Sequence, residues 1–159
     1  MRDEEFEELF DEHAPGLLAF LVYRTGDRTL AEDVLADTFE RALRARKRFD
    51  PRRASRKTWL YAIALNLLRD QFRRGEAETR AYQRVAVPEP EDTALADLER
   101  RDELAAAMAR LSPQEREAVA LRYGADLTVP EIARLTGESL STAEGRVYRG
   151  LRKLRDLLG

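Results

Sequence analysis

The chain repeats its apolar residues with the period of an α-helix in almost every segment, and no segment shows the sustained alternation of a strand. Pro and Gly residues, together with Ser and Thr residues suited to capping, separate these segments from one another. The sequence therefore predicts an all-α fold built from several helices of short or medium length.

The N-terminal block is predicted to begin with two helices. Phe6, Leu9 and Phe10 form the apolar stripe of the first. Pro15 is expected in the first turn of the second, because proline is tolerated there and interrupts a helix elsewhere. Gly26 is expected to end this second helix.

A third helix is predicted from the "TLAE" sequence at 29–32, which has the spacing of a capping box, to about residue 47. Its inward side is expected to carry Leu30, Val34, Phe39 and Leu43. A loop at 48–55 follows, since Pro51 restricts the residue before it to extended conformations. Ser55 is then placed to cap the helix at 58–74, "TWLYAIALNLLRDQFRR".

The segment 75–92 differs in composition, with prolines, acidic residues and little periodic apolar content. It is predicted to be a flexible linker between two small helical domains, at 1–74 and 93–159. In the second domain, "SPQE" at 112–115 and "TVPE" at 128–131 each predict a capped helix start with proline at its first position. Further helices are predicted from about 93 to 111 and from about 140 to the end.

The net charge of −2 conceals a strong division of charge along the chain. Residues 1–40 carry 3 basic and 12 acidic side chains, whereas residues 41–74 carry 12 basic and 2 acidic ones. Residues 146–155 add 5 basic side chains and no acidic one. Two basic blocks of this kind suit contact with phosphate, although solvated helix faces would have the same composition.

Several function classes are excluded or disfavoured by the composition. The chain has no cysteine, so it has no disulfide, thiolate nucleophile or cysteine zinc site, and its only histidine is His13. No carboxylate pair forms a convincing catalytic pocket, and we expect no enzyme activity, no metal and no cofactor. There is no signal peptide and no run of about 18 apolar residues, so the protein is expected to be cytoplasmic, without a membrane span.

The C-terminal domain contains a candidate helix-turn-helix. Ile132 and Ala133 lie on a short helix, Gly137 suits the turn, and a long basic helix follows. Such motifs place the start of the second helix in the major groove of DNA, although an ordinary helical hairpin has the same outline. The candidate DNA contacts are Ser139, Ser141, Thr142 and Arg146 near the helix start, with Arg149 and Lys153 further along for phosphates.

Four segments in order resemble bacterial RNA polymerase sigma factors. "EIARLTGESLSTAEGRVYRGLRKLRDLL" is similar to the region-four helix-turn-helix, and "SPQEREAVALRYGADLTVPEIA" to the helix before it. "AEDVLADTFERAL" resembles the polymerase-binding helix of region two, and "TWLYAIALNLLRDQFRR" its promoter-melting helix. The order, the linker and the length match the extracytoplasmic-function (ECF) group of the sigma-70 family, which keeps only regions two and four.

The resemblance implies a transcription initiation factor without a catalytic centre of its own. Such a factor binds the β′ and β subunits of core RNA polymerase, recognises the −35 and −10 promoter elements and helps to melt the DNA. The alternative is a stand-alone helix-turn-helix regulator, which would have no use for a melting helix at 58–74. The resemblance also implies a separate anti-sigma protein as a partner.

The resemblance assigns two further sets of residues. In the melting region, the candidates beside bases are Trp59, Tyr61 and Asn66, and those for phosphates are Arg52, Arg53, Arg56, Lys57, Arg69, Arg73 and Arg74. Trp59 is equally consistent with plain packing, and Asn66 with a buried amide that has a partner. The candidate polymerase contacts, spaced to lie on one side of their helix, are Asp33, Asp37, Glu40 and Arg41.

Three positions depart from the usual pattern of the family. Ala36 stands where many relatives have Gln, and Glu138 stands where an aliphatic residue usually follows the turn glycine. Glu144 replaces a common Lys in the recognition helix. It either accepts a hydrogen bond from a cytosine amino group or completes a capping box with Ser141. In both cases we expect a −35 preference different from that of relatives with Lys.

Overall fold

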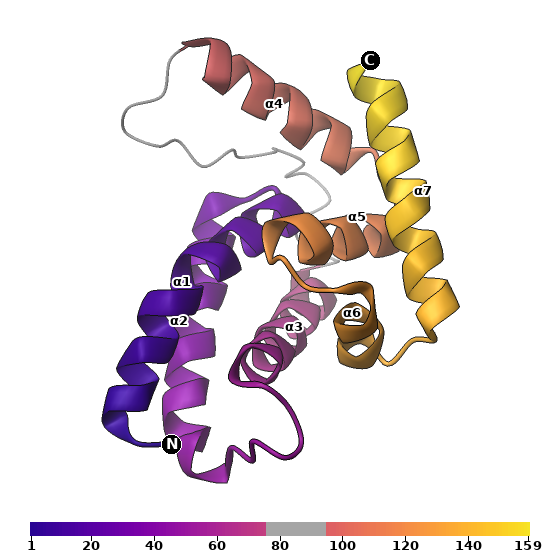
Figure 1. The fold of residues 1–159 in the computed structure, drawn as a ribbon. Helices are drawn as coiled ribbons and strands as arrows, with labels where there is room; N and C mark the ends of the chain where they lie inside the picture. The colour runs from indigo at the N-terminus through magenta and orange to yellow at the C-terminus, as the bar shows by residue number, and fades with distance from the viewer. Residues whose placement is uncertain (76–94) are drawn as a thin grey trace.

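The computed structural model describes residues 1–75 and 95–159, and these residues form helices and loops but no strand (Figure 1). The all-α prediction is therefore confirmed. Apart from Gly75, the predicted linker at 75–92 lies outside the described residues. In chain order the elements are α1 (Asp3–Thr25), α2 (Arg28–Ala45), a 3₁₀ turn η1 (Arg46–Arg48), α3 (Arg56–Gly75), α4 (Leu95–Ala109), α5 (Pro113–Val119), a π-helical turn η2 (Ala120–Gly124), α6 (Val129–Thr136) and α7 (Leu140–Leu158).

Helix α1 is one continuous helix, so the predicted break at Pro15 is wrong. Pro15 is exposed, and its ring faces solvent. Leu9, Leu17 and Phe20, on both sides of the proline, are buried in the same core. Burial of this shared stripe holds the two halves in line, which offsets the backbone hydrogen bond that the proline removes. Gly26 ends the helix in the left-handed conformation, as predicted.

Helix α2 begins two residues earlier than predicted. Asp27, not Thr29, is the cap, and its side chain accepts a hydrogen bond from the backbone N–H of Leu30. Val34 and Phe39 are buried as expected, but Leu43 is 40% exposed and was wrongly placed on the inward side. The prediction that Ser55 caps the next helix is confirmed, because its hydroxyl accepts from the N–H of Thr58 at 3.1 Å.

The C-terminal helices follow the local signals of the sequence closely. Both predicted capping boxes are present, Ser112 with Glu115 and Thr128 with Glu131, each with a proline in the first turn. Gly137 ends α6 with φ of 71°, the left-handed conformation that favours glycine. Helix α7 packs across α5, α4 and α6, and it forms one long edge of the molecule (Figure 1).

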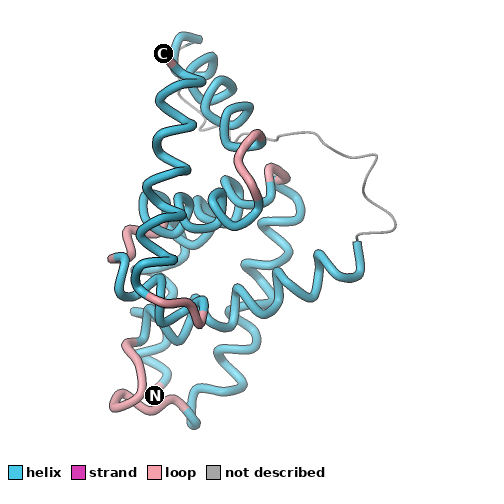
Figure 2. Tube along the Cα trace, turned by 90° about the vertical axis from the view of Figure 1, so that its right-hand side faces the viewer, coloured by secondary structure: helices cyan, strands magenta, loops and turns pink. Residues whose placement is uncertain are grey.

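The N-terminal helices α1–α3 and the C-terminal helices α4–α7 pack against each other. Helix α1 contacts η2, and α3 contacts α6, so the two parts share one hydrophobic core. Gly124 permits this approach, because a Cβ there would lie 3.4 Å from the Cα of Phe20. In the view turned by 90°, the described loops are short and connect helices that lie close together (Figure 2).

Candidate nucleic-acid and polymerase interfaces

The outer side of α3 carries the polar residues of that helix. Its inward side is formed by Leu60, Tyr61, Ala64, Leu65, Leu67 and Leu68. Asn66, Arg69, Arg73 and Arg74 are exposed. Of the two alternatives for Asn66, the buried amide is therefore excluded, and the surface position remains.

Asn66 lies where two shallow hollows of the surface meet. The first is lined by Arg41, Arg44, Ala45, Arg48 and Ile63, and the second by Arg69, Asp70, Phe72 and Arg73. An amide can both donate and accept hydrogen bonds, which suits a base edge, and guanidinium groups bind phosphate. The surface therefore has the chemistry to hold a nucleic-acid strand across α3. Arg44, Arg48 and Ile63 were not among the predicted contacts. Ile63 precedes Asn66 by three residues on α3, whereas Arg44 and Arg48 join Asn66 only through the packing of α2 and η1 beside α3.

Tyr61 is a core residue, and its prediction as a base contact is wrong in this structure. It is 1% exposed, and its ring lies 5.8 Å from that of Phe20. Burial raises the pKa of its hydroxyl above the ordinary value. Trp59 is half-buried at the edge of the core, and its ring lies 5.2 Å from that of Phe49 in the preceding loop. Packing is thus part of the role of Trp59, and a base contact stays a prediction.

The arginines in the loop before α3 are exposed, whereas the arginine at the first position of α3 has a partner. Arg52 and Arg53 are exposed on a turn closed by Asp50, whose carboxylate accepts from the N–H of Arg52 at 3.0 Å. Arg56 forms an ion pair with Glu5 of α1 at 3.1 Å.

Two further predicted phosphate contacts have partners within the chain. Lys57 donates to the backbone carbonyl of Asp126 at 3.5 Å, and Arg73 is paired with Asp70. The predicted phosphate contacts therefore do not act as one uniform basic surface in this arrangement.

The predicted polymerase contacts share the exposed side of α2. Asp33, Asp37, Glu40 and Arg41 are all exposed, opposite the buried Ala31, Val34, Thr38, Phe39 and Ala42. Arg41 also lines the first hollow, so it is close to Asn66.

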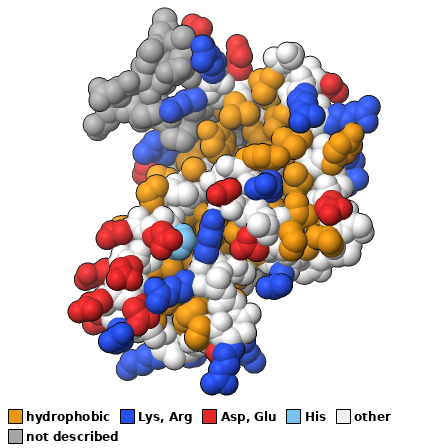
Figure 3. Space-filling view, in the orientation of Figure 1, with side chains coloured by type: hydrophobic (Ala, Val, Ile, Leu, Met, Phe, Trp, Pro, Cys, Tyr) orange, Lys and Arg blue, Asp and Glu red, His pale blue; other side chains and the backbone are white. Residues whose placement is uncertain are grey.

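An exposed apolar contact between α1 and α2 was not predicted as part of the site. Phe10 is 46% exposed, and its ring packs against Phe39 at 4.7 Å. Leu43, which is 40% exposed, is a second apolar side chain on the surface of α2. Acidic side chains gather on the α1 side of the molecule (Figure 3). Apolar and acidic side chains together suit a protein partner with a basic surface.

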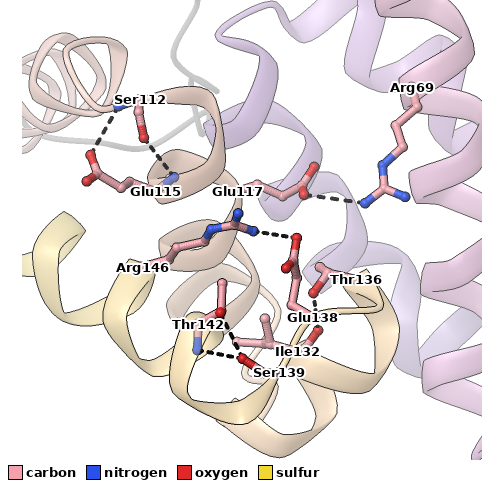
Figure 4. A network of polar contacts seen from close by, with 10 residues as sticks. All are labelled: Arg69, Ser112, Glu115, Glu117, Ile132, Thr136, Glu138, Ser139, Thr142 and Arg146. Carbon is pink, nitrogen blue, oxygen red and sulfur yellow. Dashed lines mark hydrogen bonds and ion pairs between the residues drawn. The ribbon is translucent and has the colours of Figure 1, made fainter.

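The turn before α7 is built as a helix-turn-helix requires, but its cap differs from the prediction. Ser139 caps α7, accepting from the N–H of Thr142 at 3.2 Å (Figure 4). The capping box proposed for Ser141 and Glu144 is therefore wrong, because Ser141 already lies inside the helix. Glu144 is exposed, which leaves its side chain open to contact a base.

Carboxylates from neighbouring segments bind several cations of α7. Glu138 in the turn accepts from Arg146 at 2.9 Å (Figure 4). Glu115 of α5 accepts from Lys153 at 2.6 Å and lies 3.7 Å from Arg149. The hydrogen bond from Lys153 is the main cause that holds the pKa of Glu115 below its ordinary value. These pairs join residues 8 to 38 positions apart, and no pattern in the sequence predicted them.

One carboxylate links the N-terminal and C-terminal parts. Glu117 of α5 lies 3.4 Å from Arg24 of α1. It also lies 3.7 Å from Arg69 of α3 (Figure 4). Arg24 also stacks over the ring of Phe72, 4.6 Å from its centre. Nearby, burial and the charge of Arg24 lower the pKa of Arg116 to about 10. In this arrangement Arg69, a predicted phosphate contact, is occupied by a carboxylate of the other part.

The chain is similar in sequence to known proteins over both of its parts. The family model Sigma-70 region 2 matches residues 9–78, and Sigma-70, region 4 matches residues 101–154. The RNA polymerase sigma factor CarQ of Myxococcus xanthus is 37% identical over 98% of this chain and 90% of CarQ. The ECF RNA polymerase sigma factor BldN of Streptomyces coelicolor is 34% identical over 98% of this chain, which spans 61% of BldN.

The chain belongs to the ECF group of the sigma-70 family. It is therefore a promoter-specific transcription initiation factor, as the resemblance implied. The solved structure of the sigma factor RpoE from Bartonella quintana, in complex with the anti-sigma factor NepR, matches with a TM-score of 0.82. That match has 26% sequence identity and covers 98% of this chain and 97% of RpoE.

Two further findings concern membrane spans and metal sites in the described residues. Among the described residues, no helix is long and apolar enough to cross a membrane. Within the same residues, no group of three or more His, Asp or Glu side chains could hold a metal ion.

The buried position of Glu115 leads to a prediction about stability and pH. Glu115→Gln should lower the free energy of unfolding at pH 7 by about 1–3 kcal/mol, because hydrogen bonds to a charged group are lost. The folded-state pKa of Glu115 is depressed, so its contribution is present above the ordinary pKa of 4.5 and is lost as pH falls through the folded value.

Urea unfolding of both proteins at pH 7 and at several values below 4.5 measures this difference. Glu103→Gln on the exposed side of α4 is the matched control, and it should change stability by only a few tenths of a kcal/mol. A loss for Glu115→Gln that is equal at every pH would show that the charge of Glu115 is not what stabilises the fold there.

Proposed function

We propose that this ECF sigma factor recognises the −10 element with the exposed side of α3 and the −35 element with α7. The domains would then be 1–74 for region two, 75–92 for the linker and 93–159 for region four. The observation that carries the proposal is the position of Asn66, an exposed amide between two hollows lined with arginine. In this proposal the sigma factor needs no catalytic centre and no cofactor, and it acts in the cytoplasm.

The α3 surface suits DNA whose bases are unpaired. A single strand requires groups that read base edges and cations that follow its backbone. Asn66 would serve the first purpose and the exposed Arg73 and Arg74 the second, with Arg52 and Arg53 on the loop before the helix. Half-buried Trp59 would support strand opening from the edge of this surface.

The exposed side of α2 would bind core polymerase. Asp33 and Asp37 are one helical turn apart, and Phe10, packed on Phe39 of the same helix, adds an exposed ring to the surface around α2. This combination supports docking on a basic helical surface of a polymerase subunit. RpoE was solved with an anti-sigma factor, and we include such a separate inhibitory protein among the partners of this chain.

The function is tested by gel shifts of promoter DNA with and without core polymerase. The free protein should bind duplex DNA weakly, because acidic α1 opposes the basic helices and Glu117 occupies Arg69. Core polymerase should make binding strong and selective. Glu117→Gln should raise the affinity of the free protein by about fivefold, which corresponds to ~1 kcal/mol for an ion pair.

Glu103→Gln, which removes the same charge from α4, should leave the affinity of the free protein almost unchanged. Tight, sequence-specific binding by the wild-type protein without polymerase would instead favour the stand-alone regulator.

The polymerase-binding side of α2 is tested by charge reversal. Asp33→Lys with Asp37→Lys should weaken competition for core polymerase by tenfold or more, since contacts between charged groups are worth about 1.5–3 kcal/mol each. Both residues are exposed, so the fold should persist. The same reversal at Asp102 and Glu103 on α4 is the control. Equal competition by the two double variants would refute this assignment.

The α3 surface is tested by separating base contacts from backbone contacts. Arg73→Ala with Arg74→Ala should weaken holoenzyme binding on every promoter and reduce its salt slope, by roughly one unit for each phosphate contact. Asn66→Ala should instead weaken binding to some −10 sequences more than to others, with the slope retained. Binding constants across a salt series and a −10 library measure both. A uniform loss for Asn66→Ala would remove it from base recognition.

A further inference from the structure

Two cations on one flank of α7 form ion pairs with carboxylates of the same chain. The buried stripe of the helix is formed by Ala143, Val147, Gly150 and Leu154. Arg146 and Lys153 lie beside this stripe, one bound by Glu138 at 2.9 Å and the other by Glu115 at 2.6 Å. A cation that is paired and partly buried in this way holds the helix in place and is less available to phosphate.

The face of α7 opposite the stripe presents a different set of side chains. Successive helical residues are rotated by about 100°, which places Ser141, Gly145, Tyr148 and Arg152 farthest from the core. Tyr148 is 64% exposed, the highest value among the exposed large hydrophobic side chains of the described residues. None of the predicted DNA contacts included Tyr148 or Arg152.

Gly145, three residues before this tyrosine, leaves room for the side chain of Arg149. A Cβ at Gly145 would lie 2.9 Å from a terminal nitrogen of Arg149, so the guanidinium of Arg149 extends across the glycine towards the start of the helix. The exposed ring of Tyr148 is thus accompanied by Arg149 and Arg152. An exposed aromatic side chain accompanied by two cations, on a helix whose first turn carries Ser141, suits DNA better than an apolar protein surface.

The position of Tyr148 along the helix also fits the major groove. It lies seven residues after Ser141, about 10 Å further at the usual rise per residue. The groove is about 12 Å wide, so both residues can reach bases within it. A tyrosine ring can pack against a thymine methyl group, and its hydroxyl can donate to an acceptor on a purine or thymine edge.

We propose that Tyr148 is a specificity-determining residue of the −35 site, with Arg152 on the DNA backbone. Arg146 and Lys153 then hold α7 through Glu138 and Glu115. This inference rests on the proposed function, because it requires α7 to enter the −35 element. A separate apolar groove lies between α1, α4, η2 and α7, and Tyr123 is one of the residues that line it.

The test is selection of −35 sequences from a random library by holoenzyme, followed by binding measurements. Tyr148→Ala should lose about tenfold in preference at one or two adjacent base pairs, with its melting temperature unchanged. Tyr148→Phe, which keeps the ring, should give a profile between those of wild type and Tyr148→Ala. Tyr123→Ala removes a second tyrosine, 57% exposed, and should keep the wild-type profile.

A salt series separates Arg152 from Lys153. Arg152→Ala should reduce the salt slope of promoter binding by about one unit, whereas Lys153→Ala should lower the melting temperature and keep the slope. The reverse pattern would overturn the assignment of the two cations.

The remaining outcomes are also decisive. A wild-type profile for Tyr148→Ala, or an equal change for Tyr123→Ala, would overturn the role of Tyr148. If Tyr148→Ala weakens only the binding of core polymerase, its surface contacts protein and the inference is wrong. A wild-type holoenzyme that selects no −35 sequence at all would overturn the proposed function itself, and with it this inference.

Discussion

The close crossing of α7 over α5 is the constraint on which the C-terminal part depends. At Gly150 the two helices approach so closely that a Cβ would lie 2.5 Å from a methyl group of Val119. Any residue with a Cβ at this position would force the side chain of Val119 to move. Beside this point, Glu115 binds Lys153 and lies near Arg149, so its charge opposes rotation of α7 about its axis. Contact and ion pair together decide which residues of α7 face solvent.

In the N-terminal part, packing likewise decides which residues of α3 face solvent. Burial of its leucines and Tyr61 fixes the rotation of the helix and leaves Asn66 outward between two arginine-lined hollows. Each part thus offers one helix whose inward stripe determines an outward polar surface. Glu117 connects them through its ion pair with Arg69, so the promoter contact proposed for Arg69 would compete with this packing of the two parts for one guanidinium.

Several local signals were read from the sequence correctly, but the caps proposed at Thr29 and Ser141 were wrong, since Asp27 and Ser139 hold those places. Features set by distant contacts were missed. The capping boxes at Ser112 and Thr128 and the turn at Gly137 involve residues within one helical turn, and all three are present. The predicted break at Pro15 and the predicted base contact of Tyr61 were wrong, because burial against other helices decided both. Residue spacing along one helix cannot reveal a carboxylate that arrives from another segment, and for that reason the partners of Arg146 and Lys153 were missed.

The central claim is that two helices read two promoter elements only when core polymerase is present. Photocrosslinking tests it most directly, with a photoreactive amino acid placed at position 66 or 148 and labelled promoter DNA. With core polymerase, position 66 should crosslink near −10 and position 148 near −35, and both signals should disappear without it. Equal crosslinking from position 148 without polymerase, and none from position 66 with it, would contradict the account.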